Sequence, residues 1–247
     1  MEKKFELTEN YVVNEFGTKL YQIKCTKTFE YAKKGELGGF IEKEENLSQE
    51  GDAWVSGDAW VFGDARVSGD AWVYGNAWVS GDAQVFGNAW VYDDARVFDD
   101  AQVFVNARVF GDAWVYGDAW VYGDARVSGD ARVSGDAWVS GDARVFGNAQ
   151  VYGNARVYGT AWVSGNACLK SDADHCGFDC FGSSNRHTHA YLTSDNTVEI
   201  TCGCFRGSIG EFEKRVKNTH AGTVYENQYN AIINVIKIKF GLDETSK

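Results

Sequence analysis

The chain has 247 residues and a formal net charge of −11, with 35 acidic residues against 24 basic ones. This balance argues against a general phosphate-binding surface, and therefore against general binding of nucleic acids. No stretch is long and apolar enough to cross a membrane, and residues 1–6 lack the apolar centre of a signal peptide. We therefore expect a cytoplasmic protein whose six cysteines stay reduced.

Residues 1–50 predict an N-terminal β cap. Apolar and β-branched residues at 11–13 and 19–25 flank turn-forming residues at 14–17, a pattern typical of paired strands. Residues 37–41 form a further short apolar run that leads into the next segment. The segment contains no grouping of side chains that suggests catalysis.

Residues 51–170 consist of twenty consecutive six-residue units of the form Gly-Asp/Asn-Ala-x-Val-x. A fixed short period predicts a stacked solenoid in which each unit is stable only against its neighbours. Ala and Val lie two apart, so both point to one face of a short strand and form a narrow interior. Gly followed by Asp or Asn fits the corner between strands, because these residues tolerate a left-handed backbone.

Three successive units depart from this pattern, since Asp93, Asp99 and Val105 replace the corner glycine. Drift in a redundant repeat is one explanation. The other is a distinct belt in which neighbouring aspartates face a partner or a cation.

The alternation of Ala53 and Val55, and of Ala59 and Val61, resembles the hexapeptide-repeat superfamily of left-handed parallel β-helices. The resemblance implies a mainly β fold with six to seven triangular coils of three hexads each. The closer likeness is to uncharacterised bacterial and phage hexapeptide-repeat proteins, which carry a transferase label without an agreed activity. Many members of the superfamily are homotrimers, and acyl transfer is its commonest activity.

Taking every third hexad gives three outward columns that are rich in aromatic residues and arginine. All nine tryptophans lie in the repeats. A wall of such side chains would exceed the apolar patch that a monomer usually exposes, so we expect a binding or assembly surface. The candidate interface residues are Trp54, Trp72, Trp90, Arg108, Arg126 and Arg144 on the first face, Trp60, Trp78, Arg96 and Trp114 on the second, and Trp120 and Trp138 on the third.

Residues 171–247 predict a C-terminal α+β cap that holds every histidine and most of the cysteines. A hairpin with a two- or four-residue loop would pair His189 with Cys202 and His187 with Cys204, so that all four share one face. Two cysteines and two histidines suit tetrahedral zinc. Plain packing of a buried face and a disulfide are the alternatives, and we expect no other cofactor.

Two helices should follow this hairpin. Ser208 and Glu211 form a capping box that begins a helix reaching about His220, and a second apolar stripe predicts a helix from near Tyr225 to Phe240.

These patterns favour a non-enzymatic binding or scaffold protein, expected to be a homotrimer that uses its outward columns for assembly and for a protein partner. The first alternative is a protein that sequesters a nucleotide-like small molecule, for example during evasion of a host defence if the chain is phage-encoded. The second is an acyltransferase. No hexad contains the histidine base that the resemblance would require, and His175 is the only positional candidate.

Overall fold

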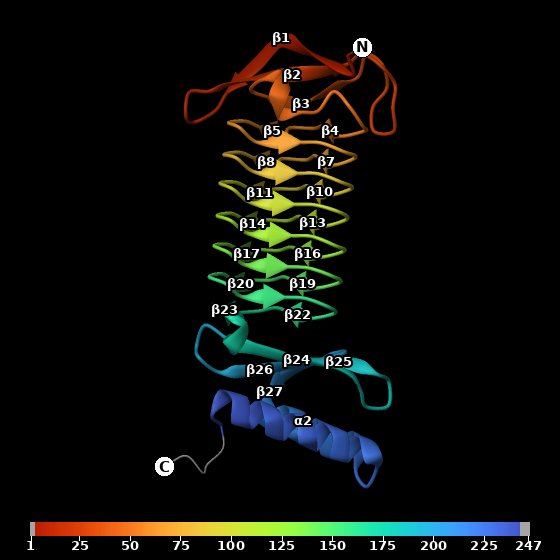
Figure 1. Ribbon diagram of the computed structural model, residues 1–247, viewed down its shortest axis with the longest axis vertical. Coiled ribbons are helices and arrows are strands. Elements are labelled where there is room, and N and C mark those ends of the chain that lie inside the picture. The colour runs from red at the N-terminus through yellow and green to blue at the C-terminus, as the bar shows by residue number, and fades with distance from the viewer. Residues whose placement is uncertain (1–2, 243–247) are drawn as a thin grey trace.

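The protein is an elongated parallel β-solenoid of about seven turns with a cap at each end (Figure 1). The computed structural model describes residues 3–242. The first two and last five residues of the predicted caps therefore lie outside the described residues. Within residues 3–242, neither helix is both long and apolar enough to span a membrane.

The three-hexad coil predicted above is confirmed, because each two-residue strand pairs in parallel with the strand eighteen residues further along. Face 1 carries β4 (Trp54–Val55), β7 (Trp72–Val73), β10 (Trp90–Val91), β13 (Arg108–Val109), β16 (Arg126–Val127), β19 (Arg144–Val145) and β22 (Trp162–Val163). Face 2 carries β5 (Trp60–Val61), β8 (Trp78–Val79), β11 (Arg96–Val97), β14 (Trp114–Val115), β17 (Arg132–Val133), β20 (Gln150–Val151) and β23 (Cys168–Leu169). Face 3 carries β6 (Arg66–Val67), β9 (Gln84–Val85), β12 (Gln102–Val103), β15 (Trp120–Val121), β18 (Trp138–Val139) and β21 (Arg156–Val157).

The interior of the solenoid consists of the repeated alanines and valines, which are fully or almost fully buried. The corners are left-handed, and a side chain at a corner glycine would meet the backbone of the next coil. At Gly111, for example, φ is +68° and a Cβ atom would lie 3.0 Å from the amide nitrogen of Gly129. The hexad thus follows from a narrow core and a corner that admits little more than glycine.

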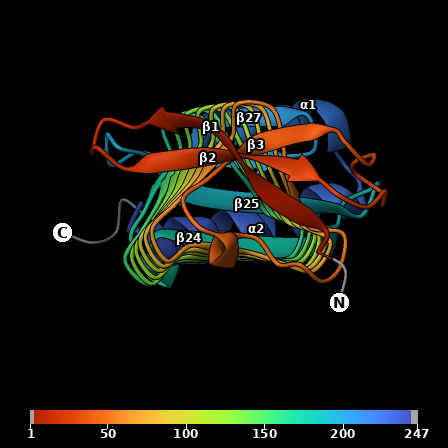
Figure 2. The ribbon, with the colours of Figure 1, turned by 90° about the horizontal axis from the view of Figure 1, so that it is seen from above.

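The N-terminal cap extends the sheet of face 2. Strands β1 (Phe5–Val13), β2 (Lys19–Cys25) and β3 (Leu37–Ile41) are successively antiparallel, and β3 pairs in parallel with β5. Figure 2 shows these strands crossing the end of the coil stack. A short 3-10 helix, η1 (Glu44–Asn46), follows.

Two buried polar side chains close the open edge of the first coil. The Lys4 ammonium donates to the carbonyls of Gly51 and Ala53 at 3.2 and 2.8 Å. The Asn46 amide donates to the carbonyls of Gly63 and Ala65 at 3.0 and 2.8 Å. Backbone acceptors that have no further coil to pair with are therefore satisfied by the cap.

The C-terminal cap is a four-stranded antiparallel sheet with two helices on its outer side (Figure 1). A second 3-10 helix, η2 (Asp172–Asp174), precedes this sheet. The elements are β24 (His175–Phe181), β25 (Arg186–Leu192), β26 (Val198–Cys202), β27 (Phe205–Ser208), α1 (Ile209–His220) and α2 (Val224–Phe240). The Ser208 capping box is present, and both helices lie close to the predicted positions.

Candidate binding surfaces

Three arginines stack on successive coils of face 1. Strand pairing places Arg108 opposite Arg126, and Arg126 opposite Arg144. Tryptophans end this arginine ladder: the Arg108 guanidinium lies 4.5 Å from the ring centroid of Trp90, and that of Arg144 lies 5.1 Å from the centroid of Trp162. The ladder is a continuous cationic strip in a chain that is otherwise acidic.

No described carboxylate forms an ion pair with any of these three guanidinium groups. Neighbouring coils lie about 4.8 Å apart, so adjacent charges repel by roughly 1 kcal/mol in water. At one corner beside Arg108, the Asn88 amide donates to Asn106 and that of Asn106 donates to Asp124, both at 3.1 Å. A hollow of about 380 Å³ lies here, lined by Glu30, Tyr31, Asp70, Asn88, Trp90, Asn106, Arg108, Asp124 and Arg126. An external negative charge would relieve the repulsion.

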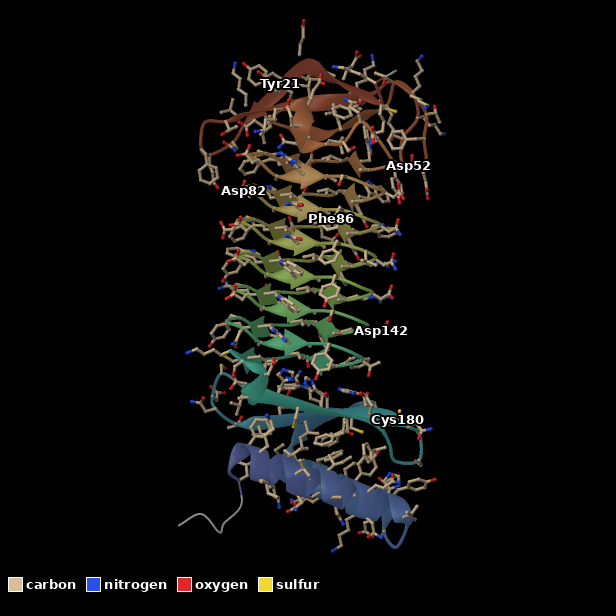
Figure 3. The ribbon with its side chains drawn as sticks, in the orientation of Figure 1. Tyr21, Asp52, Asp82, Phe86, Asp142 and Cys180 are labelled. Carbon is tan, nitrogen blue, oxygen red and sulfur yellow. The ribbon has the colours of Figure 1, made fainter. Side chains whose placement is uncertain are left out.

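The corner that leads into face 3 carries the opposite charge. Aspartates occupy this corner in five successive coils, at Asp64, Asp82, Asp100, Asp118 and Asp136. Of these, Asp64 alone forms an ion pair among the described residues, with Lys43 at 2.6 Å. The remaining four line an open groove of about 710 Å³ together with Gln84, Gln102, Trp120, Trp138, Asn154 and Arg156. Figure 3 shows Asp82 at one edge of the prism and Asp52 and Asp142 at the other.

The outward aromatic rings cover one another along the solenoid axis. The rings of Trp60 and Trp78 stack at 4.9 Å, and those of Trp120 and Trp138 stack at 5.3 Å. Arginine continues the columns, as where Arg96 lies between Trp78 and Trp114. Because rings and guanidiniums occupy each other's faces, most of the tryptophans in these columns are half-buried, whereas Arg126, Arg132 and Arg144 are exposed. The apolar surface is smaller than the sequence suggests.

The prediction that Trp54 belongs to an outward interface is wrong. Its position in the hexad is outward, yet its side chain is completely buried. The ring of Phe29, in the loop between β2 and β3, meets it edge-on at 5.3 Å, and the ring of Tyr31 stacks on Trp72 at 5.0 Å. The N-terminal cap therefore covers the first two tryptophans of face 1. The candidate residues other than Trp54 and Trp72 have half-buried or exposed side chains on the outer surface.

The expected pairing of the C-terminal hairpin is wrong by one residue. Thr188, not His189, pairs with Cys202, and His189 pairs with Thr201. The loop has three residues, 194–196, closed by a hydrogen bond from the Thr193 amide to the Thr197 carbonyl. Asn196 takes the left-handed conformation (φ +56°) that this loop length favours.

This register separates the four predicted zinc ligands. His187 and His189 point toward the solenoid, whereas Cys202 points toward the helices and contacts the Tyr229 hydroxyl at 3.8 Å. Cys204 lies exposed in the turn that follows β26. No group of three or more potential ligands in residues 3–242 is arranged to hold a metal ion. The zinc site inferred from the sequence is therefore not assembled.

The histidines instead join the C-terminal cap to the last coil. His189 Nδ1 lies 3.2 Å from the carbonyl oxygen of Trp162, so this nitrogen carries the proton and donates. His189 Nε2 is then the acceptor for His175 Nδ1 at 3.0 Å. Burial lowers the pKa of His189 to about 3 and also lowers that of His175, which keeps both rings neutral.

His175, the candidate base of the acyltransferase alternative, lies within this buried chain. Its free Nε2 has no hydrogen-bond partner among the described residues, and the nearest carboxylate oxygen, on Asp172, lies 3.9 Å away. A third histidine, His187, donates through Nδ1 to Asp179 at 2.6 Å. The spacing of residues 187 and 189 correctly places both histidines on one face, but nothing in the sequence indicates that this face meets the solenoid.

Comparison with known protein families supports the solenoid assignment. Residues 59–75, 65–81, 125–141 and 149–165 match a family model described as the YdcK beta solenoid repeat. The matched stretches all lie within the hexads and cover less than half of the chain. No curated protein matches the sequence significantly.

Proposed function

We propose that this β-solenoid repeat protein is a non-enzymatic binding scaffold that assembles as a homotrimer. In the assembly, face 1 of each protomer packs against face 3 of the next. The observation that carries the proposal is the arginine ladder, a strip of three stacked charges without an ion pair among residues 3–242. The aspartates of face 3 provide the complementary charge.

The two charged columns match in height along the solenoid axis. One coil takes eighteen residues, and Asp118 follows Arg108 by ten residues while preceding Arg126 by eight. Asp118 therefore lies about halfway between the heights of these two arginines. Asp100 and Asp136 repeat this relation one coil lower and one coil higher. Both columns share the spacing of about 4.8 Å, so they can interleave as carboxylate, guanidinium, carboxylate.

In a trimer whose threefold axis runs parallel to the solenoid, the matched columns of neighbouring protomers lie at the same heights. Cyclic trimers join two different surfaces of neighbouring protomers, and rotation about the axis leaves heights unchanged. Trp120 and Trp138 stand beside the aspartates on face 3, which gives the interface the aromatic and arginine content typical of binding surfaces. Face 2, with Trp60, Trp78 and Trp114, would stay outward and present a surface to a protein partner.

Charge reversal tests the assembly. Light scattering should give a mass about three times the 27.3 kDa of one chain for the parent protein. Reversing the arginine ladder with Arg108→Glu, Arg126→Glu and Arg144→Glu should produce monomers. Adding Asp100→Lys, Asp118→Lys and Asp136→Lys to the same chain should restore trimers, because the two columns then attract again.

The matched control is Arg132→Glu on face 2, which should leave the trimer unchanged. A monodisperse monomer at tens of micromolar parent protein would refute the proposed assembly. So would a trimer that survives reversal of the arginine ladder, because the interface would then lie elsewhere.

A further inference from the structure

Trp162 is the last tryptophan of face 1, where the ladder of stacked side chains ends. One side of its ring lies against Arg144 at 5.1 Å. In earlier coils the hexad eighteen residues onward, on the same face, supplies a side chain for the other side of the ring. No such hexad follows β22 on face 1. The side chain is 39% exposed, the largest value among the nine tryptophans. A flat aromatic surface is thus left free beside the C-terminal cap.

The space beside this ring is a cleft between the last coil and the cap, with a volume of about 300 Å³. Its lining combines one aromatic ring with polar groups from both sides: Thr160, Trp162, Asn185, Arg186, His187, Thr201 and Gly203. A cleft of this size admits a small molecule that carries one ring system.

Arg186 supplies the positive charge of the cleft. Its side chain is exposed and makes no ion pair with any carboxylate in the described part of the chain. It crosses directly over Gly203, where a Cβ atom would lie 2.7 Å from Arg186 Cδ. Gly203 also has a φ of +59°. The turn at residue 203 therefore both requires glycine and leaves room for the arginine.

The walls of the cleft are fixed by hydrogen bonds. The Trp162 carbonyl accepts from His189 at 3.2 Å and from the Thr201 hydroxyl at 3.4 Å, which fastens the cap to the coil that carries the ring. On the opposite wall, Asp179 accepts from both His187 and Thr160, at 2.6 and 3.3 Å. An aromatic face, a free guanidinium and hydroxyl groups are thereby held around one space without needing a ligand to order them.

We propose that this cleft binds a small planar aromatic molecule that carries an anionic group. The ring system stacks on the open side of Trp162, and the anion pairs with Arg186. The hydroxyl oxygens of Thr160 and Thr201, whose protons are already donated within the protein, can accept hydrogen bonds from polar substituents. All the lining residues belong to one chain, and they lie at the C-terminal end of face 1, one coil beyond Arg144 of the proposed trimer interface.

Matched probes test the two halves of the site separately. Isothermal titration of the full-length protein with AMP, GMP and UMP should show saturable binding of at least one nucleotide at one site per chain. Adenosine lacks the anion and ribose 5-phosphate lacks the ring, so each should bind at least tenfold more weakly than AMP if AMP is the bound probe. A nucleotide that binds should also quench part of the tryptophan fluorescence.

Variants then assign the binding to this cleft. Trp162→Ala and Arg186→Ala should each raise the Kd at least tenfold, while Arg186→Lys retains the charge and should lose less. Arg132→Ala is the control, because Arg132 also stacks on a tryptophan but lies far along face 2; its Kd should stay within twofold of the parent value. Far-ultraviolet circular dichroism confirms folding of each variant. Failure of all three nucleotides to bind would overturn the proposal, as would binding that both alanine variants leave unchanged.

Discussion

Replacing Val105 with glycine should stabilise the solenoid. Val105 has a φ of +66°, in the left-handed region that side chains rarely adopt. Asp93 and Asp99 occupy the other two corners of the same coil with φ of +59° and +58°. Each aspartate accepts a hydrogen bond from an amide of the next coil at 3.3 Å, whereas valine has no group that could do so. Val105 is therefore the most strained corner of the three.

The expected gain follows from three contributions. A non-glycine residue in this conformation costs about 1–3 kcal/mol, and branching at Cβ places valine in the upper part of that range. Part of this gain, about 0.5–1 kcal/mol, is offset because glycine has more conformational freedom to lose when the chain folds. The valine side chain is 44% exposed, so the loss of its partly buried methyl groups costs roughly 0.5 kcal/mol. We expect a net gain of about 1 kcal/mol, or about 2–4 °C in Tm.

Thermal and urea unfolding followed by circular dichroism would measure this gain. Asp93→Gly should change stability little, because it removes a favourable hydrogen bond together with the strain. The reciprocal change Gly129→Val, at a φ of +64° with a Cβ atom 3.0 Å from the Gly147 amide nitrogen, should cost about 1–3 kcal/mol. If Val105→Gly melts no higher than the parent while Gly129→Val is tolerated, the account of the corners is wrong.

Three further predictions concern the two caps. Trp54→Ala should destabilise the protein by about 3–5 kcal/mol in urea, because this ring is fully buried, while Trp138→Ala on the outer surface should cost much less. Asn46→Ala should cost about 2–4 kcal/mol, since two buried carbonyls lose their donor; an unchanged urea midpoint would contradict the capping role. The pKa of His189 lies below its unfolded value of 6.5, so the unfolded chain binds more protons between about pH 3 and 6.5. Stability should be complete above pH 6.5 and fall as the pH drops through that window, and His189→Asn should reduce the loss measured between pH 7 and 4.5.

The fold of the repeats could be predicted because each hexad repeats the same local requirements. Alanine and valine fit a narrow interior, glycine fits the corner, and twenty copies leave little room for another architecture. The hairpin register could not be predicted in this way, because a loop of three residues and one of four differ by a single position. That one-residue shift moves Cys202 to the opposite face from His187.

The burial of Trp54 also escapes prediction from its own hexad. Its unit is nearly identical to others whose tryptophan lies on the surface, and what differs is the loop that carries Phe29. Contacts between segments distant in sequence decide such cases. The cleft beside Trp162 is a similar case, since it exists because the repeats end there and a sheet of different origin begins.

The pairing of each strand with the strand eighteen residues onward has a consequence for how this protein can change its length. Insertion or loss of a whole coil leaves both caps above the same faces, and it lengthens or shortens the charged columns by one step. Loss of a single hexad would instead turn the C-terminal cap by a third of a revolution, and β25 would then no longer lie over the same column. Evolution of such a chain is therefore expected to proceed in units of three hexads, with the caps inherited intact at either end.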